Sequence, residues 1–194
     1  MSDDEFHVHG PHDHELEHAG HGEGHDSHKM TNQIAMFTAI IATVGAIFGY
    51  MGGATQANAG LYKNNAAISK TEASNQWNYY QAKSSKQNLS ELAKEIAPLA
   101  KKDFYDEEIK RYKTEKGDIK KNAEALENKS KEWDEKSDKE MHEHHRWAQA
   151  TTALQISIAL AAIALLTRKT WLQKGMMGMG ALGLILGALA ALHI

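Results

Sequence analysis

Three stretches of about twenty residues carry no charged side chain at all, namely residues 34–54, 148–166 and 175–194. At ~1.5 Å per residue, a helix of this length crosses a hydrocarbon layer of ~30 Å. A buried helix of a soluble protein is the alternative for any one stretch, but three in 194 residues favour membrane spans. The overall apolar content of 42% is ordinary for a soluble domain, because apolar and charged residues are segregated along the chain.

The apolar stretches alternate with polar segments, and this layout predicts an all-α membrane protein. We expect three transmembrane helices, with a long antiparallel coiled-coil hairpin between the first and the second. The expected segments are a disordered acidic His-rich tail (1–30), a first transmembrane helix (31–54), an extramembrane helical hairpin (55–147) that turns near 98–103, a second transmembrane helix (148–167), a short basic loop (168–174) and a third transmembrane helix (175–194).

The polar segment 55–147 carries 18 Lys and Arg against 17 Asp and Glu, and its less polar residues recur in heptads. Pro98 is expected to end the first helix, and Asp103 to cap the second. In the second helix, 3-4 spacing predicts a seam of Ile109, Tyr112, Lys116, Ile119, Ala123, Leu126, Ser130, Trp133 and Ser137. In the first helix, seven-residue spacing predicts a seam of Leu61, Ile68, Asn75, Ala82, Leu89 and Ile96, with Leu92 and Leu99 near its end.

The two helices are expected to pair with residue numbers that sum to about 202. Trp133 would then lie beside Ile68, and Trp77 beside Leu126. We interpret Trp77, Tyr80 and Trp133 as packing residues, since aromatics at helical spacing usually pack. A platform on which a ligand stacks is the alternative for the aromatic cluster around Trp77.

The run from Glu72 to Ser84 reads EASNQWNYYQAKS. It resembles the signature of a bacterial membrane-protein family known as domain of unknown function number 4337. That family is also similar in its acidic, His-rich start, its early hydrophobic helix and its two hydrophobic helices at the end. The resemblance implies a bacterial membrane protein without an established activity, and it supplies no catalytic residue.

Small residues recur every four positions in each apolar stretch. Such spacing lets helix backbones approach closely in a bilayer, so we expect tight packing and homo-oligomers. The three series are Gly45, Gly49 and Gly53 in the first stretch, Ala153, Ser157 and Ala161 in the second, and Gly183, Gly187 and Ala191 in the third.

Histidines are concentrated in the acidic tail, where imidazole and carboxylate groups are suitable ligands for Zn, Ni or Cu. No spacing repeats as it would in a closed finger, so the expected binding is labile. The alternative is a solvated tail whose charge changes near pH 6.5. The candidate ligands are His7, His9, His12, His14, His18, His21, His25 and His28.

A second histidine cluster, around His142 and His145, directly precedes the second apolar stretch. Residues three apart are neighbours on one face of a helix. Three transmembrane helices would bring His193 to the same side of the membrane, so the three imidazoles form a candidate Zn or Cu site. A hydrated polar ring at the lipid headgroups, with Arg146 and Trp147 as anchors, is the alternative.

Other chemistry lacks the residues that it needs. The chain has no cysteine, no Gly-rich phosphate loop, no Ser/His/Asp arrangement and no basic patch for nucleic acid. Neither Glu72 nor Lys83 has the neighbours that acid–base or nucleophilic catalysis requires. The sequence therefore predicts a protein that is not an enzyme and does not bind nucleic acid. The lipid bilayer is an expected partner under each functional hypothesis.

Orientation follows from Lys and Arg in short loops. Arg168, Lys169 and Lys174 lie between the last two spans, and Lys29 precedes the first span. This favours the tail in the cytoplasm and the hairpin outside it. For the bacterial membrane protein that the resemblance implies, the expected location is the inner membrane with the hairpin in the periplasm. The lysines at the membrane-proximal ends of the hairpin argue for the opposite orientation.

Three functions remain open from the sequence. The leading hypothesis is a non-enzymatic membrane scaffold or assembly protein, which oligomerises through its membrane helices and whose hairpin self-associates or holds a protein partner. The first alternative is a metal-handling protein that uses the His-rich tail for Zn, Ni or Cu. The second alternative is a subunit similar to those of channels or motor stators, although only Thr, Ser and Gln could supply polar groups in a pore.

Overall fold

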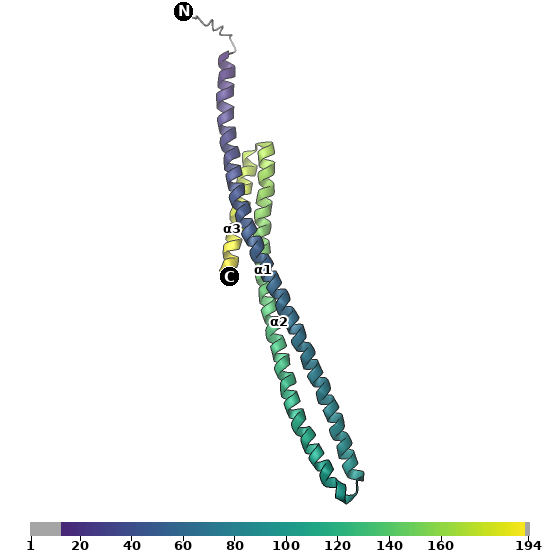
Figure 1. Ribbon diagram of the computed structural model, residues 1–194. Helices are drawn as coiled ribbons and strands as arrows, with labels where there is room; N and C mark the ends of the chain where they lie inside the picture. The colour runs from purple at the N-terminus through teal and green to yellow at the C-terminus, as the bar shows by residue number, and fades with distance from the viewer. Residues whose placement is uncertain (1–12, 193–194) are drawn as a thin grey trace, which may run out of the picture. The chain divides into compact units, whose positions relative to one another are not determined.

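The computed structural model describes the backbone of residues 13–192 and the side chains of residues 29–192. In that range the regular elements are α1 (Asp13–Ile96), the short 3-10 helix η1 (Leu99–Lys101), α2 (Lys102–Thr167) and α3 (Thr170–Ala191), as Figure 1 shows. The all-α class is confirmed. Each of the three long helices is long and apolar enough to cross a membrane, by length and composition.

A disordered tail is expected from the sequence as far as residue 30, whereas α1 begins at Asp13. Extending an existing helix costs much less than nucleating a new one, so the apolar helix that follows can propagate toward the N-terminus. Residues 1–12 of the expected tail lie outside the described residues.

The turn between α1 and α2 is built around Pro98. A residue that precedes proline disfavours the helical conformation, and α1 ends one residue earlier, at Ile96. Pro98 is extended (φ −57°, ψ 150°), and its carbonyl accepts a hydrogen bond from the Lys101 N–H at 2.9 Å. Asp103 therefore lies inside the first turn of α2 and not at its N-cap. A carboxylate in the first turn still interacts favourably with the helix dipole.

The link between α2 and α3 is shorter than the loop 168–174 that was expected. It consists of Arg168 and Lys169 alone, because α3 begins at Thr170. Arg168 adopts the left-handed conformation (φ 52°), and its N–H donates to the Ala164 carbonyl at 2.9 Å, which closes the last turn of α2. Glycine usually takes this position, so an arginine gave no sequence signal for the turn.

The chain divides into two compact units, which we describe separately. The apolar unit consists of the residues up to Gly52 and the residues from His145 onward. The polar unit is Gly53–His144. Both α1 and α2 contribute to each unit, and α3 belongs to the apolar unit alone.

The core of the apolar unit brings together all three long helices. Ser157 on α2 is buried, and its hydroxyl donates to the Met176 carbonyl on α3 at 2.7 Å. At one end, the Gln173 side-chain amide donates to Gln33 at 3.1 Å, which joins α3 to α1. The buried hydrophobic cluster consists of Ile34, Ala161, Ala164, Leu172 and Met176.

Candidate functional site in the polar unit

The face that α2 presents to α1 in the polar unit is the one that its heptad spacing predicts. Every residue of the predicted seam is buried or half-buried, so this seam is confirmed. The buried residues are Ile109, Ile119, Ala123 and Ser137, and the half-buried ones are Tyr112, Lys116, Leu126, Ser130 and Trp133.

The seam predicted for α1 is wrong. Its large apolar residues are exposed: Leu61 by 57%, Ile68 by 49%, Leu89 by 65% and Ile96 by 81%. A second heptad line, displaced by two residues, is buried in their place. It contains Ala59, Ala66, Ala73 and Gln87, and between them Ser69 is also buried.

Close approach of the two backbones explains why the small residues are inside. The Ser130 hydroxyl donates to the Ala66 carbonyl at 2.9 Å, and the Ser137 hydroxyl donates to the Ala59 carbonyl at 2.8 Å. The distance between packed helices depends on the side chains at the contact, and alanine permits a short one. The line of large apolar residues was therefore the wrong choice for the inner face of α1.

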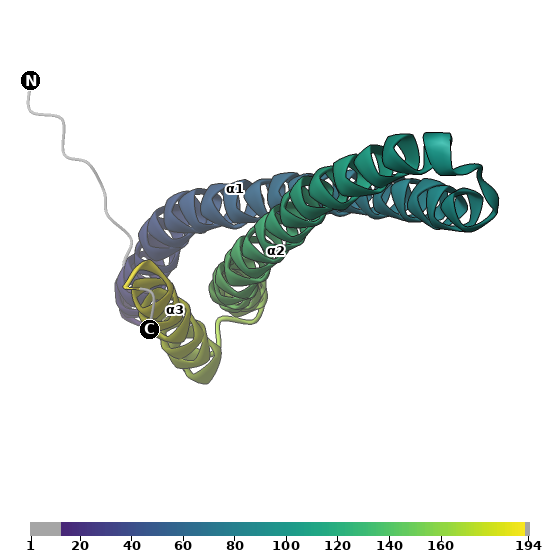
Figure 2. The ribbon, with the colours of Figure 1, turned by 90° about the horizontal axis from the view of Figure 1, so that it is seen from below.

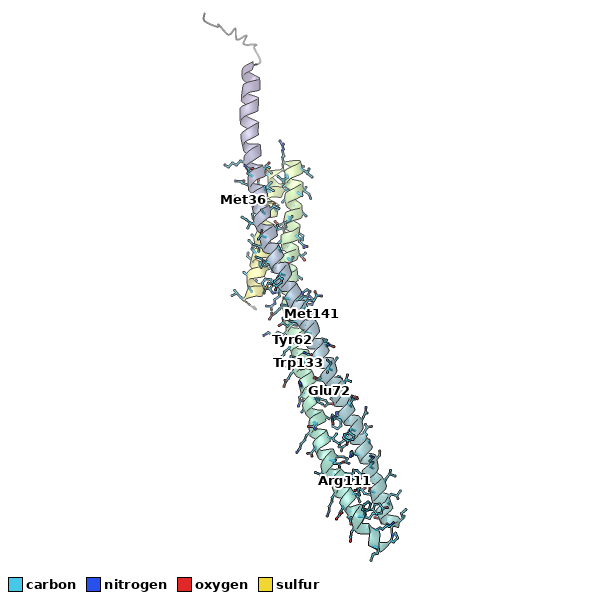
Figure 3. The ribbon with its side chains drawn as sticks, in the orientation of Figure 1. Met36, Tyr62, Glu72, Arg111, Trp133 and Met141 are labelled. Atoms are coloured by element: carbon cyan, nitrogen blue, oxygen red, sulfur yellow. The ribbon has the colours of Figure 1, made fainter. Side chains whose placement is uncertain are left out.

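The contacts between α1 and α2 run in opposite chain directions (Figures 1 and 2), from Lys63 with Asp134 (2.5 Å) to Lys94 with Asp106 (2.6 Å). Trp133 stacks on Tyr62 with ring centroids 5.5 Å apart (Figure 3), whereas Ile68 was its predicted neighbour. The residue numbers of the paired side chains sum to 195 for this pair, 200 for Lys94 with Asp106 and 204 for Trp77 with Glu127, close to the expected 202.

Trp77 and Tyr80 make packing contacts within the polar unit. The Trp77 indole N–H donates to Glu127 at 2.9 Å, next to the predicted neighbour Leu126. The Trp77 and Tyr80 rings meet edge to face at 5.7 Å. A groove of about 580 Å³ opens on this side of the seam, where Ala73 leaves space; polar lining residues include Lys70, Ser74, Asn78, Gln81 and Lys131.

The middle of the seam is charged. Lys83, whose side chain is 15% exposed, pairs with Glu115 at 2.5 Å and lies over the Tyr112 ring at 5.5 Å. One layer away, Lys116 lies over the Tyr80 ring at 5.2 Å and donates to the Ser84 hydroxyl at 2.9 Å. Each lysine thus meets an aromatic ring of the opposite helix, a cation–π arrangement that suits partly desolvated cations.

These contacts shift two ionisation equilibria in opposite directions. The hydrogen bond from Lys83 holds the pKa of Glu115 below its ordinary value. The same bond, followed by one with Tyr79, raises the pKa of Lys83 above its ordinary value. The ion pair therefore stabilises the polar unit between the two unfolded pKa values, about 4.3 for Glu and about 10.4 for Lys.

We expect Glu115→Gln to flatten the dependence of polar-unit stability on pH. The stability that the wild-type carboxylate contributes is present above the unfolded Glu pKa and is lost as pH falls through the lowered folded pKa. Thermal unfolding followed by circular dichroism between about pH 3 and pH 8 measures this dependence around that pKa. Glu107→Gln, at an exposed position of α2, is the control and should retain the wild-type profile. Identical profiles for wild type and Glu115→Gln would contradict the expectation.

The predicted metal ligands lie mostly outside the described residues. These are His7, His9, His12 and His193, and of His14, His18, His21, His25 and His28 only the backbone is described. His142 and His145 are exposed. Among residues 29–192 no three His, Cys, Asp or Glu side chains are grouped so that they could hold a metal ion.

The predicted packing glycines divide into three groups by the space around them. A Cβ at Gly183 or Gly187 would collide with Leu154 or Phe48 of the same chain, so both glycines are packed inside the apolar unit. Gly45 is in ordinary contact range of Leu154. A Cβ at Gly49 or Gly53 would meet nothing within 4 Å.

One surface was not expected from the sequence, namely the exposed face of α1 that carries the residues predicted to lie in the seam. We call it the outer face; all its residues are exposed, and they are Leu61, Ile68, Asn75, Ala82, Leu89 and Ile96, with Leu92 and Leu99 near the turn. The heptad spacing was visible in the sequence. Only the burial of Ala59, Ala66 and Ala73 shows that the line faces outward.

The chain matches the family described as "Domain of unknown function (DUF4337)" over residues 30–193. The chain belongs to this family. The match covers both compact units, and the resemblance drawn from the Glu72–Ser84 run is confirmed. No curated protein and no solved structure matches the chain.

Proposed function

We propose that this protein is a non-enzymatic integral membrane scaffold. The apolar unit lies in the bilayer as three transmembrane helices. The polar unit is an antiparallel coiled-coil hairpin that self-associates or holds a protein partner through the outer face. The observation that carries this proposal is the outer face itself, because large apolar residues at heptad spacing are exposed along a charged, water-compatible unit.

The composition of the apolar unit's surface supports membrane insertion. Its helices bury Gly180, Gly183 and Gly187 together with large residues such as Ile34 and Met176, and they also expose many large apolar side chains. A soluble protein rarely exposes so large an apolar surface, whereas a lipid-facing surface is apolar. The exposed apolar residues come from all three helices and include Met36, Ile40, Ile47, Ile156, Ile163, Leu182, Ile185 and Leu189.

Basic residues suggest the orientation. The two-residue link between α2 and α3 is Arg168-Lys169, and Lys174 follows within the first turns of α3. With Lys29 on the same side, the rule for short loops favours the cytoplasm for this side. The protein then belongs in the inner membrane of a bacterium, with the polar unit in the periplasm.

The charged residues of the polar unit support a structural role for its interior. Lys83, Glu115, Lys116 and Arg111 each contact a side chain that fixes the seam or its flank. Groups held in this way set register between helices, which is the best-attested use of polar residues in a coiled coil.

The test is the double variant Leu89→Glu with Ile96→Glu, measured as the native mass of the full chain extracted from membranes in mild detergent. Two charges on the outer face should reduce the mass of the assembly while the helices stay folded, since both positions are exposed. Asn128→Glu, on exposed α2 surface, introduces the same group as a control. An unchanged mass for the double variant would refute docking through the outer face.

A further inference from the structure

Both arms of the polar unit have an exposed surface, but the two differ sharply in charge. Residues 53–96 of α1 hold eight charged side chains, whereas residues 102–144 of α2 hold 25. The α2 arm is thus a solvated surface. The α1 arm places its smallest residues in the internal seam and its largest aliphatic residues on the outer face.

This distribution is unfavourable for a helix pair that remains alone in water. Burying Leu61 and Ile68 in the seam would remove more apolar area from water than burying Ala59 and Ala66. The arrangement is consistent with a second surface that covers the outer face. The outer face runs from Leu61 to Ile96, about 52 Å at 1.5 Å per residue.

We propose that the outer face is covered by the outer face of a second copy of this chain, with the two α1 helices parallel and in register. The proposal rests on the scaffold function above and names its partner. Two copies inserted in one membrane with the same orientation carry the same residues at the same height. A parallel arrangement then places each heptad position opposite itself.

The charged residues beside the outer face permit pairing with an identical chain. On the helix surface, each outer-face residue is flanked by the residues three and four positions after it. The residues four positions after include Glu72 and Lys86, which have opposite charges. The residues three positions after include Asn64, Thr71, Asn78 and Ser85. A face flanked by many like charges would repel its own copy. This one has little net charge to oppose pairing.

Asn75 lies in the middle of the outer face, between Ile68 and Ala82. A single asparagine at a core position of a parallel coiled coil specifies register and a two-stranded state. In the proposed dimer, Asn75 meets Asn75 of the second copy, and the two amides can bond to each other. A parallel pair brings the two Asn75 amides together only when the helices are in register.

The area is adequate for a specific contact. The outer face is about 52 Å long on a helix about 10 Å wide, so it covers on the order of 500 Å² per copy. The total of about 1,000 Å² reaches the lower limit for a biological interface. Confinement of both copies to one membrane raises their effective concentration, which favours an interface of this size.

The experiment uses single-cysteine variants of the full chain in native membranes, because the chain has no cysteine of its own. A short bismaleimide should link Leu61→Cys to itself and Ile96→Cys to itself, each in yields several times that of the control Asn128→Cys. An antiparallel pair would link Leu61→Cys only to Ile96→Cys in mixed expression, and that result would overturn the parallel arrangement.

The outcomes also separate this inference from the scaffold function. If no outer-face cysteine links to itself, yet Leu89→Glu with Ile96→Glu still reduces the native mass, a different protein covers the face and the second copy is excluded. If neither experiment responds, both proposals fail. Asn75→Leu is a second check: it should retain crosslinking while the dimer gives way to a mixture of oligomers.

Discussion

Replacing Ala59 and Ala66 together by leucine is expected to separate α1 from α2 in the polar unit. Both methyl groups lie where the backbones are closest, since Ser137 and Ser130 hydroxyls reach the carbonyls of these alanines. Overpacking costs about 1–3 kcal/mol at each site, and each lost hydrogen bond adds about 0.5–1.5 kcal/mol. The double variant should therefore lose about 3–9 kcal/mol, enough to unfold a marginal pair of helices.

Hydrogen exchange read by mass spectrometry localises this effect. Amides of residues 53–144 should lose protection in the full chain, while those of the apolar unit keep it. The control is Ala57→Leu with Ala67→Leu, the same exchange at two exposed positions of α1. Surface changes of this kind stay within about 0.5 kcal/mol. Equal loss of protection in both double variants would show that the alanine line is not the seam.

Gly183→Leu and Gly187→Leu are each expected to unfold the packing of α3 in the apolar unit. A Cβ at Gly183 would lie 2.8 Å from Leu154 Cγ and 3.1 Å from the Leu154 backbone nitrogen, which cannot move aside as a side chain can. At Gly187 the obstacle is the Phe48 ring, which itself packs on Trp147 at 5.3 Å. Overpacking of this severity costs about 3 kcal/mol or more per site.

Thermal unfolding in detergent, followed by tryptophan fluorescence, reports this loss because Trp147 is part of the packed cluster. Gly178→Leu is the matched control in the same helix, since a Cβ there meets nothing within 4 Å. If Gly178→Leu were as damaging as Gly187→Leu, the glycines would matter through helix conformation and not through contact. Gly49→Leu, also open, should leave the apolar unit folded.

Gly183 and Gly187 show what the small-residue spacing leaves open. Close packing at Gly183 and Gly187 could be inferred from sequence, but the partner could not. Glycine leaves a groove that any neighbour can fill, so the same pattern fits contact within a chain and between copies. The fold assigns Leu154 and Phe48 as the neighbours, which makes these glycines determinants of folding.

The sequence by itself determined the elements and one of the two seams. Each of these depends on local chemistry. The uncharged stretches match the hydrocarbon layer in helix length, and Pro98 lacks the N–H that a helix needs. In α2, large residues such as Ile109 and Trp133 recur on one face. Such features are independent of what the helix packs against. The left-handed Arg168 had no such local signal, since glycine is the usual residue there.

Tertiary structure decided which face of α1 is inside. That helix carries two heptad lines, one of Ala59, Ala66 and Ala73 and one that contains Leu61 and Ile68, and periodicity alone cannot rank them. The choice depends on the separation of the two backbones, which the Ser130 and Ser137 hydroxyls make short. A distance between helices is a property of the pair, and so it is absent from the pattern of either helix read alone.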